Sequence, residues 1–291
     1  MQRLREGPFF LRAEELNRLM NFDFSQIAVP FRMQPGLRRL APDASQLTPL
    51  APASPLYQEK LHVLQAGQSR HCIAGFDPSP ALEAIAAKAR HDMQPGTVRV
   101  EVPLELAFEE DLAILDGATT ALPWLCVCVP SHWAPEEKLG LPFAAVHAPV
   151  ADNALLQSAG AQLVDLVTGG DCWERHVWTI SSSARHDQHP RRHARTPWPS
   201  APADHAFAAH CFLRAERQTF FPVGKGTRQA VFTIRVMVQP LVQAVSTCDR
   251  AQRLHDSLAS MSDAVLAYKG LAPAREPLLR WLSRRAASQG A

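Results

Sequence analysis

The chain has 291 residues, of which 46% are hydrophobic and 20% are charged, and its formal net charge at pH 7 is +2. This length allows one large domain or two small ones, each with a sizeable buried core. The hydrophobic fraction is that of a globular protein and argues against a disordered or fibrous chain. The small net charge gives no argument for binding to nucleic acid.

The amino terminus and the cysteines indicate the compartment. The first residues, MQRLREGPFF, mix Arg with Glu and lack the apolar core of a secretory signal. No stretch approaches 18 uncharged apolar residues, so no membrane span is predicted. The six cysteines form no CxxC pair and no disulfide-scaffold spacing. We therefore expect a cytoplasmic protein with reduced thiols that binds neither membrane nor nucleic acid.

The first hundred residues predict short helices joined by irregular chain. Helical patterning predicts three helices, at residues 12–20, 57–66 and 79–91. Residues 41–56 are rich in Pro, Ala and Ser, which is typical of an irregular connection. Residues 98–104 alternate between apolar and polar side chains, and this alternation predicts a half-buried strand.

The second half of the chain predicts a sheet. A short apolar segment at 112–115 is followed by the nearly uninterrupted apolar run LPWLCVCVP at 122–130, which we expect to be a buried central strand. Residues 153–167 have the pattern of an amphipathic helix, with Asp152 or Asn153 available as its cap. The remaining expected elements are strands at 175–182, 208–221 and 229–238 and helices near 249–268 and 275–286.

This order of elements is two strands, a helical stretch ending in one longer helix, and three strands. It predicts an α+β fold with an antiparallel five-stranded sheet and flanking helices rather than repeated βαβ units. Residues 1–110 are expected to be an N-terminal extension packed on a core at 111–240, and residues 241–291 to be C-terminal helices. Neither GxGxxG nor GxxxxGK[ST] occurs, so a Rossmann or P-loop nucleotide site has no support.

Three of the twelve histidines lie in one basic stretch, RHDQHPRRHAR: His186, His189 and His193. The neighbouring arginines disfavour a bound metal cation. The simplest interpretation is a solvated basic loop, and a docking patch for an acidic partner is the functional alternative.

Another histidine, His147, lies in GLPFAAVHAPV, at the end of an apolar run and directly before the predicted helix. A neutral imidazole there is suited to bind a metal or haem iron. A buried structural histidine is the competing interpretation. His71, in SRHCIAG, is a second candidate of the same kind.

Polar side chains also gather on one predicted strand. In AHCFLRAERQTFF, Arg214, Glu216 and Gln218 share one face. If that face is solvated, it is an ordinary sheet edge. If it lines a cavity, Glu216 is a buried carboxylate with Arg214 near it, suited to relay protons or to bind a cationic amine.

Five segments occur in an order that resembles one known family. They are PFRMQPGL, LCVCVPSHWAPEEKLGLPFAAVHAPV, LRAERQTF, AVFTIRVMVQPL and AYKG, between residues 30 and 270. Members of the haem-dependent oxidative N-demethylase alpha-subunit family carry a similar PSxW…EKxGxP…IHxPV stretch, an RxERQT strand and a YKG.

The resemblance implies a haem-binding Per-ARNT-Sim (PAS) fold that works as a monooxygenase. In such an enzyme haem b binds O2, and electrons arrive from NADPH through partner reductase subunits that carry FMN and a 2Fe-2S cluster. A secondary methylamine, such as dimethylamine, is demethylated to a primary amine and formaldehyde.

The resemblance also implies roles for single residues. His147 matches the IHxPV histidine and is the expected axial ligand of the haem iron, with His71 as the alternative. Glu216 matches the ERQT glutamate and is expected on the O2 side of the haem, together with Trp178 and Arg214. Cationic partners for the haem propionates are expected among Arg217, Lys225, Arg228 and Arg235.

The chain departs from the family in two places. Residues 220–223 read FFPV where relatives often continue with L-R-R-L-P, which removes two candidate propionate cations, and HVWTI stands where an Asn-Trp pair is common. No ferredoxin-like cysteine pattern or flavin motif occurs, so the reductase is expected on another chain. Two other functions stay open: a haem-PAS gas sensor without turnover, and a structural subunit without haem.

Overall fold

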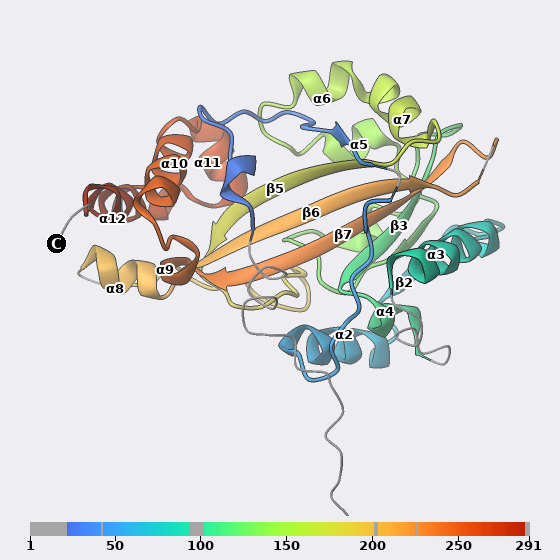
Figure 1. Ribbon diagram of the computed structural model, residues 1–291, viewed down its shortest axis with the longest axis horizontal. Coiled ribbons are helices and arrows are strands. Elements are labelled where there is room, and N and C mark those ends of the chain that lie inside the picture. Colours follow the sequence, from blue (N-terminus) through green and yellow to red (C-terminus); the bar gives the residue numbers. More distant parts are fainter. Residues whose placement is uncertain (1–21, 42, 94–101, 201–202, 225, 289–291) are drawn as a thin grey trace, which may run out of the picture.

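A computed structural model describes residues 22–41, 43–93, 102–200, 203–224 and 226–288. Its centre is one antiparallel sheet with the strand order β1-β5-β6-β7-β3-β4-β2 (Figure 1). The strands are β1 (Arg38–Arg39), β2 (Arg70–Cys72), β3 (Glu110–Asp116), β4 (Trp124–Cys126), β5 (Trp173–Ser181), β6 (Phe212–Pro222) and β7 (Gln229–Pro240). The α+β class is confirmed. The expected number of five strands is wrong, because the short strands β1 and β2 add one strand at each edge.

Two of the expected strands differ from the observed ones. The run at 122–130 is buried throughout its second half, with Val127 and Cys128 fully inaccessible, but only three of its residues form β4, and β4 lies next to the edge strand β2. Beyond β4, Val127 donates its N–H to the carbonyl of Ser69 (2.8 Å), and Val129 donates its N–H to a carboxylate of Asp111 (2.7 Å) and not to a strand carbonyl. The segment 204–209, DHAFAA, forms a helix before β6, as its alanines favour.

The helices surround this sheet. They are α2 (Pro55–Gln65), α3 (Ser79–Asp92), α4 (Leu104–Ala107), α5 (Phe143–His147), α6 (Ala154–Ser158), α7 (Gly160–Thr168), α8 (Asp204–Ala209), α9 (Leu241–Ala244), α10 (Cys248–Ala259), α11 (Asp263–Lys269) and α12 (Arg275–Ala287). The expected helices at 57–66, 79–91 and 275–286 are confirmed as α2, α3 and α12. The side chain of Ser54 caps α2, and Pro55 occupies its first position.

Two long expected helices are each divided. The helix expected at 153–167 breaks at Ala159 into α6 and α7. The helix expected at 249–268 becomes α10 and α11, because Ser262 accepts a hydrogen bond from the backbone of Val265 and starts a new helix. Leu104, the last residue of an expected strand, begins the helix α4, and the rest of that strand at 98–101 lies outside the described residues, as does the helix expected at 12–20.

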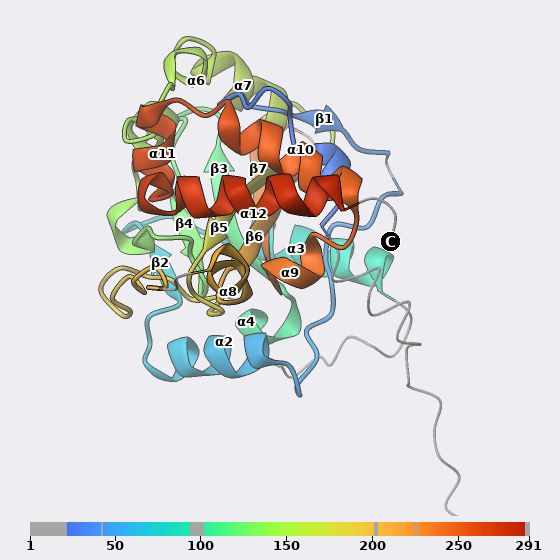
Figure 2. The ribbon, with the colours of Figure 1, turned by 90° about the vertical axis from the view of Figure 1, so that its left-hand side faces the viewer.

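The two faces of the sheet are covered by different helices (Figures 1 and 2). We call one the α10 face: Trp178 of β5 and Leu213 and Ala215 of β6 belong to a core that includes residues of α10, α11 and α12. We call the other the α7 face: Leu115 of β3 belongs to a core that includes Val164 and Val167 of α7. The register of β5 and β6, in which Val177 lies opposite Glu216, assigns Glu216 to the α7 face.

A buried ion pair connects α2 to the sheet. The Nζ of Lys60, which is fully inaccessible, lies 3.0 Å from Oδ1 of Asp111 and donates to the carbonyls of Phe108 (3.1 Å) and Glu110 (2.8 Å). Burial opposes the charge of Lys60, but the carboxylate of Asp111 outweighs it, and the pKa of Lys60 is raised.

Within the described part of the chain, no helix is both long and apolar enough to cross a bilayer.

Replacement of Lys60 by Met should destabilise the fold by about 3–5 kcal/mol, because it leaves the carboxylate of Asp111 buried without its cation. Urea denaturation measures this loss. The matched control is Arg228→Met, which removes an exposed partner of Asp165 and should cost less than about 1 kcal/mol. Equal losses in the two variants would contradict the assigned role of the buried pair.

Candidate functional site

The α7 face of β6 carries a buried carboxylate. Glu216 is 8% exposed, and each of its oxygens accepts a hydrogen bond. The hydroxyl of Ser131 donates to Oε1, and Nε2 of Gln218 donates to Oε2 (2.7 Å). These two bonds hold the carboxylate in one orientation. The interpretation of this face as a solvated sheet edge is therefore wrong.

The neighbouring Arg214 is 1% exposed and uses its guanidinium to hold other segments. Its Nε donates to the hydroxyl of Ser131 (2.8 Å), and its terminal nitrogens donate to the carbonyls of Arg185 (3.1 Å), Val129 (3.2 Å) and His186 (2.8 Å). Arg214 therefore positions the hydroxyl that binds Glu216.

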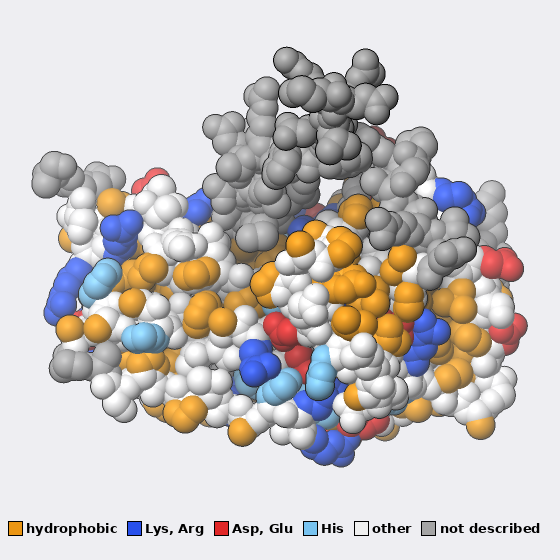
Figure 3. Space-filling view, turned by 90° about the horizontal axis from the view of Figure 1, so that it is seen from below, with side chains coloured by type: hydrophobic (Ala, Val, Ile, Leu, Met, Phe, Trp, Pro, Cys, Tyr) orange, Lys and Arg blue, Asp and Glu red, His pale blue; other side chains and the backbone are white. Residues whose placement is uncertain are grey.

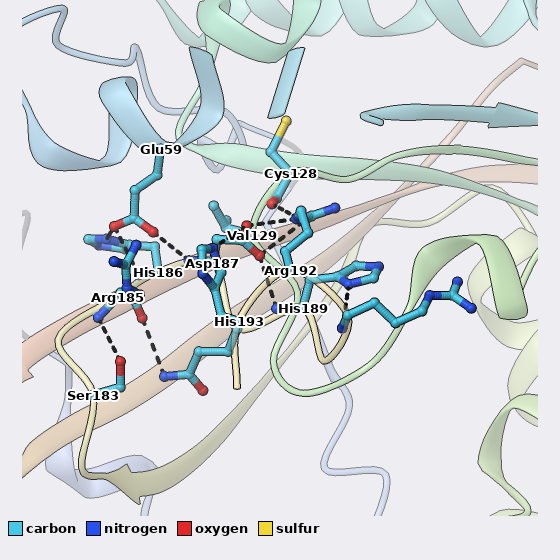
Figure 4. A network of polar contacts seen from close by, with 12 residues as sticks. Glu59, Cys128, Val129, Ser183, Arg185, His186, Asp187, His189, Arg192 and His193 are labelled. Atoms are coloured by element: carbon cyan, nitrogen blue, oxygen red, sulfur yellow. Dashed lines mark hydrogen bonds and ion pairs between the residues drawn. The ribbon is translucent and has the colours of Figure 1, made fainter. Parts of the chain in front are cut away.

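The basic stretch RHDQHPRRHAR folds into a hydrogen-bonded loop against α2 (Figure 4). A carboxylate oxygen of Glu59 accepts from the backbone N–H of Asp187 (2.7 Å), and Asp187 pairs with Arg192 (2.8 Å). Arg192 also donates to the carbonyl of Cys128 (2.8 Å). Asp187 is 2% and His189 3% exposed, so the loop is not solvated throughout, although Arg185, Arg191 and Arg195 are exposed as expected. No group of three or more His, Cys, Asp or Glu side chains in the described residues could hold a metal ion.

A polar cavity of about 280 Å³ lies between this loop and the segment that follows β4. Figure 3 shows Lys, Arg and His side chains gathered with carboxylates in its lower centre. Burial, together with the charges of Arg195 and Arg214, lowers the pKa of His132 in the cavity wall to about 4. His132 directly follows Ser131, so the cavity adjoins the residue that binds Glu216. Its lining includes five cationic or imidazole groups and one carboxylate, that of Asp187; the five are His132, Arg185, Arg192, His193 and Arg195.

His147 is the last residue of α5, and its ring is fixed on both sides. Its Nδ1 lies 2.8 Å from the carbonyl oxygen of Phe143, and the two rings stack with centroids 4.0 Å apart. The side chain of Asn153 donates to the carbonyl of His147 (3.0 Å), which holds the end of the helix. Among the described residues, none hydrogen-bonds its Nε2.

The protonation of His147 follows from these contacts. Burial lowers the pKa of His147, the hydrogen bond to Phe143 opposes this, and the charges of Arg175 and Lys138 lower it again. A neutral ring that donates from Nδ1 to a carbonyl has its lone pair on Nε2. This is the form in which histidine binds a metal ion.

Arg175 connects the surroundings of His147 and Glu216. It lies opposite Gln218 in the β5–β6 register and therefore on the α7 face. Its charge acts on His147, and the charge of Glu216 acts on it. Arg175 is not among the site residues predicted from the sequence. The pattern that could have indicated it is a charged residue two positions before Val177, on the same face of one strand.

The YKG segment, residues 268–270 at the end of α11, contacts β5 next to the site. The Nζ of Lys269 donates to the carbonyl of Trp178 (2.7 Å), and burial lowers the pKa of Lys269 to about 8 although Glu216 opposes that shift. Gly270 has φ +67°, and a Cβ there would lie 2.5 Å from the guanidinium of Arg195. The positive φ favours glycine at this helix end, and a Cβ would push the flexible Arg195 side chain aside.

The structure brings Glu216 and Arg214 together but separates other expected site residues from them. Trp178 lies opposite Ala215, on the α10 face, and packs edge-on against Phe31. Arg217 lies on the same α10 face and pairs with Glu174 (2.9 Å). Trp178 and Arg217 therefore do not share a site with Glu216, because residues an odd number of positions apart along a strand face opposite ways.

The remaining candidates are dispersed. Arg235 lies opposite Arg217 on the α10 face and pairs with Glu109 (2.7 Å). His71 lies in β2, four strands from β6 and thus ~19 Å away, and its Nε2 is buried without a hydrogen bond. Arg228 is exposed and pairs with Asp165. Lys225 lies outside the described residues.

Comparison with known families identifies the chain at family level. The model of the family described as haem-dependent oxidative N-demethylase, alpha subunit-like matches residues 81–279. The chain belongs to this family. No curated protein matches the sequence. The N-demethylase match includes Ser131, His147, Arg175, Glu216 and Lys269, and the family description names haem and an enzyme in which this chain type is one subunit. The resemblance found in the sequence is confirmed.

The residues on the α7 face fit haem as the cofactor of an N-demethylase subunit. His147 offers a neutral imidazole with a free Nε2 in an oriented ring, which is the donor that haem iron takes from proteins. The wall around it is apolar, with Phe143, Trp173 and Phe220 packed beside Leu115. A flat apolar group that needs one axial nitrogen is compatible with this surface.

Replacement of Arg214 by Gln should lower the free energy of unfolding by at least about 3 kcal/mol, because three backbone carbonyls and Ser131 lose a buried donor. Urea denaturation measures this. Arg217→Gln is the control on the opposite face of the same strand, and it should cost about 1 kcal/mol because Glu174 keeps Arg38 as a partner. A loss for Arg214→Gln no larger than the control's would show that Arg214 does not hold these segments.

Proposed function

We propose that this chain is the catalytic alpha subunit of a haem-dependent oxidative N-demethylase, a cytoplasmic monooxygenase. It would use O2 and NADPH-derived electrons to demethylate a secondary methylamine, such as dimethylamine, to a primary amine and formaldehyde. The observation that carries this proposal is the buried carboxylate of Glu216 on a sheet face whose Arg175 also acts on His147.

We assign haem binding to residues 111–240 as a PAS-like domain, with residues 1–110 as an extension and 241–291 as completing helices. The order of elements supports this assignment: β3 and β4, the helical stretch α5–α7, then β5, β6 and β7. These five strands are also neighbours in the sheet, in the order β4-β3-β7-β6-β5.

In this proposal His147 would hold the iron of haem b through its Nε2. Haem, when bound, supplies the activation of O2 and the oxidation of the methyl group. The hydrogen bond from Nδ1 to the carbonyl of Phe143 keeps the ring in one tautomer and one orientation. Asn153 fixes the backbone of His147, so the ring cannot swing with the end of α5.

Glu216 binds the substrate nitrogen. A secondary amine is protonated at pH 7, and its N–H groups donate to a carboxylate in a charge-assisted hydrogen bond. Transfer of one proton from the ammonium nitrogen to Glu216 leaves the neutral amine beside the haem. Ser131 and Gln218 hold the two carboxylate oxygens during this transfer, and Arg214 holds Ser131.

The electrons come from partner subunits. The six cysteines are free in the structure and lack the spacing of an iron–sulfur site. FMN and the 2Fe-2S cluster therefore belong to reductase chains that oxidise NADPH.

Replacement of His147 by Ala should abolish the Soret band of protein reconstituted with haem, or shift it to that of a different coordination, because the axial nitrogen is lost. Absorption spectroscopy of the purified variant measures this. His71→Ala is the control and should keep the wild-type band. If His147→Ala keeps the wild-type band and His71→Ala loses it, the ligand of the haem iron is His71 and not His147.

Replacement of Glu216 by Gln should lower dimethylamine-dependent NADPH oxidation by a factor of about 10²–10⁴, because the amide cannot take the proton of the ammonium ion. The assay needs haem-loaded protein and a reductase. Glu174→Gln, a buried carboxylate on the opposite face, is the control and should keep most of the turnover. If wild-type protein binds haem and O2 but shows no amine-dependent turnover, the gas-sensor function replaces the enzyme.

A further inference from the structure

Arg175 is a half-buried cation to which the described residues offer no ion pair and no hydrogen bond. Its Nε is inaccessible to solvent and has no hydrogen-bond partner. The other arginines of β6 and β7 are paired: Arg214 binds three carbonyls, Arg217 binds Glu174, and Arg235 binds Glu109. Arg175 therefore differs from these arginines in having no partner among the described residues.

Such a group is costly to bury. A guanidinium stays charged in proteins, so it cannot escape the penalty by losing a proton, as a buried lysine can. Burial lowers the pKa of Arg175, and the charges of Glu216 and Tyr268 oppose this only in part. Glu216 makes no hydrogen bond to Arg175; its two oxygens accept from Ser131 and from Gln218.

A second unpartnered donor lies on the same face. The indole Nε1 of Trp173 is buried without a hydrogen bond, and Trp173 precedes Arg175 by two residues on β5, roughly 7 Å along the strand. Both side chains are on the α7 face, where Trp173 packs beside Phe143, the residue that stacks on His147. Buried donors are almost always paired in folded proteins, so two orphans on one face indicate a missing acceptor.

We propose that Arg175 binds a carboxylate of the ligand held on the α7 face. The planar fork of a guanidinium matches the two oxygens of a carboxylate, and such a pair satisfies both its charge and its donors. The inference rests on the proposed function, which offers two sources of this group: a haem propionate, or the carboxylate of an N-methyl amino acid bound as substrate. It replaces Arg217 and Arg235, which lie on the opposite face.

The first arm of the test uses haem and haem dimethyl ester, which differ only in the carboxylates. Soret titration of the haem-free full chain gives both dissociation constants. Wild type should bind haem at least about tenfold more tightly than the ester, and Arg175→Gln should remove that preference. Arg175→Lys should restore part of it, and Arg217→Gln should keep all of it.

The second arm uses haem-loaded protein titrated with N-methylglycine and with dimethylamine, which share the methylated nitrogen but differ in the carboxylate. If the substrate is the source, Arg175→Gln weakens the spectral response to N-methylglycine at least about tenfold and leaves that to dimethylamine unchanged. A loss of carboxylate discrimination in either arm supports the proposal. Unchanged discrimination in both arms overturns it.

Stability separates this role from a structural one. The haem-free Arg175→Gln chain should have a urea midpoint no lower than wild type, because the substitution removes an unpaired, half-buried charge. A clearly lower midpoint would assign Arg175 to the fold and overturn the proposal. If wild type binds neither haem nor its ester, the proposed function fails. The role of Arg175 is then tested by the melting temperature of the haem-free chain with and without N-methylglycine. A rise in the wild type that is lost in Arg175→Gln supports the proposal. No rise in the wild type refutes it.

Discussion

The buried guanidinium of Arg214 joins three segments that are far apart in the sequence. It extends from β6 to carbonyls of the basic loop and to Val129 and Ser131 in the segment after β4. The same segment is tied to β3, because Val129 donates to Asp111, and Asp111 holds Lys60 of α2. One chain of polar contacts thus runs from α2 through the sheet to Glu216. The orientation of the carboxylate depends on every member of this chain.

The α7 face combines groups that a sheet built only for stability would not bury. Glu216, Arg214 and Arg175 are charged and share this face with Asp111 of β3, while Ala113, Leu115 and Leu125 on the same face are apolar. Charges taken out of water weaken a fold unless they are paired, and the half-buried Arg175 has no partner among the described residues. An unpaired charge of this kind is typical of a surface that is completed by a ligand.

The sequence allowed some of this to be predicted and not the rest, for physical reasons. The two-residue period of a strand correctly placed Arg214 and Glu216 on one face. It could not place Trp178, since the phase between β5 and β6 is set by their register, and this register puts Val177 opposite Glu216. Arg175 was missed for the same reason. The pairing of Lys60 with Asp111 joins residues 51 positions apart, and no local pattern reports such a contact.

The contact between Gly270 and Arg195 has a mechanical consequence. The end of α11 lies so close to the guanidinium in the cavity wall that a Cβ at Gly270 would push the Arg195 side chain aside. Because Arg195 lines the cavity and Gly270 ends α11, a larger residue at position 270 would displace a cation of the cavity wall from a helix outside it.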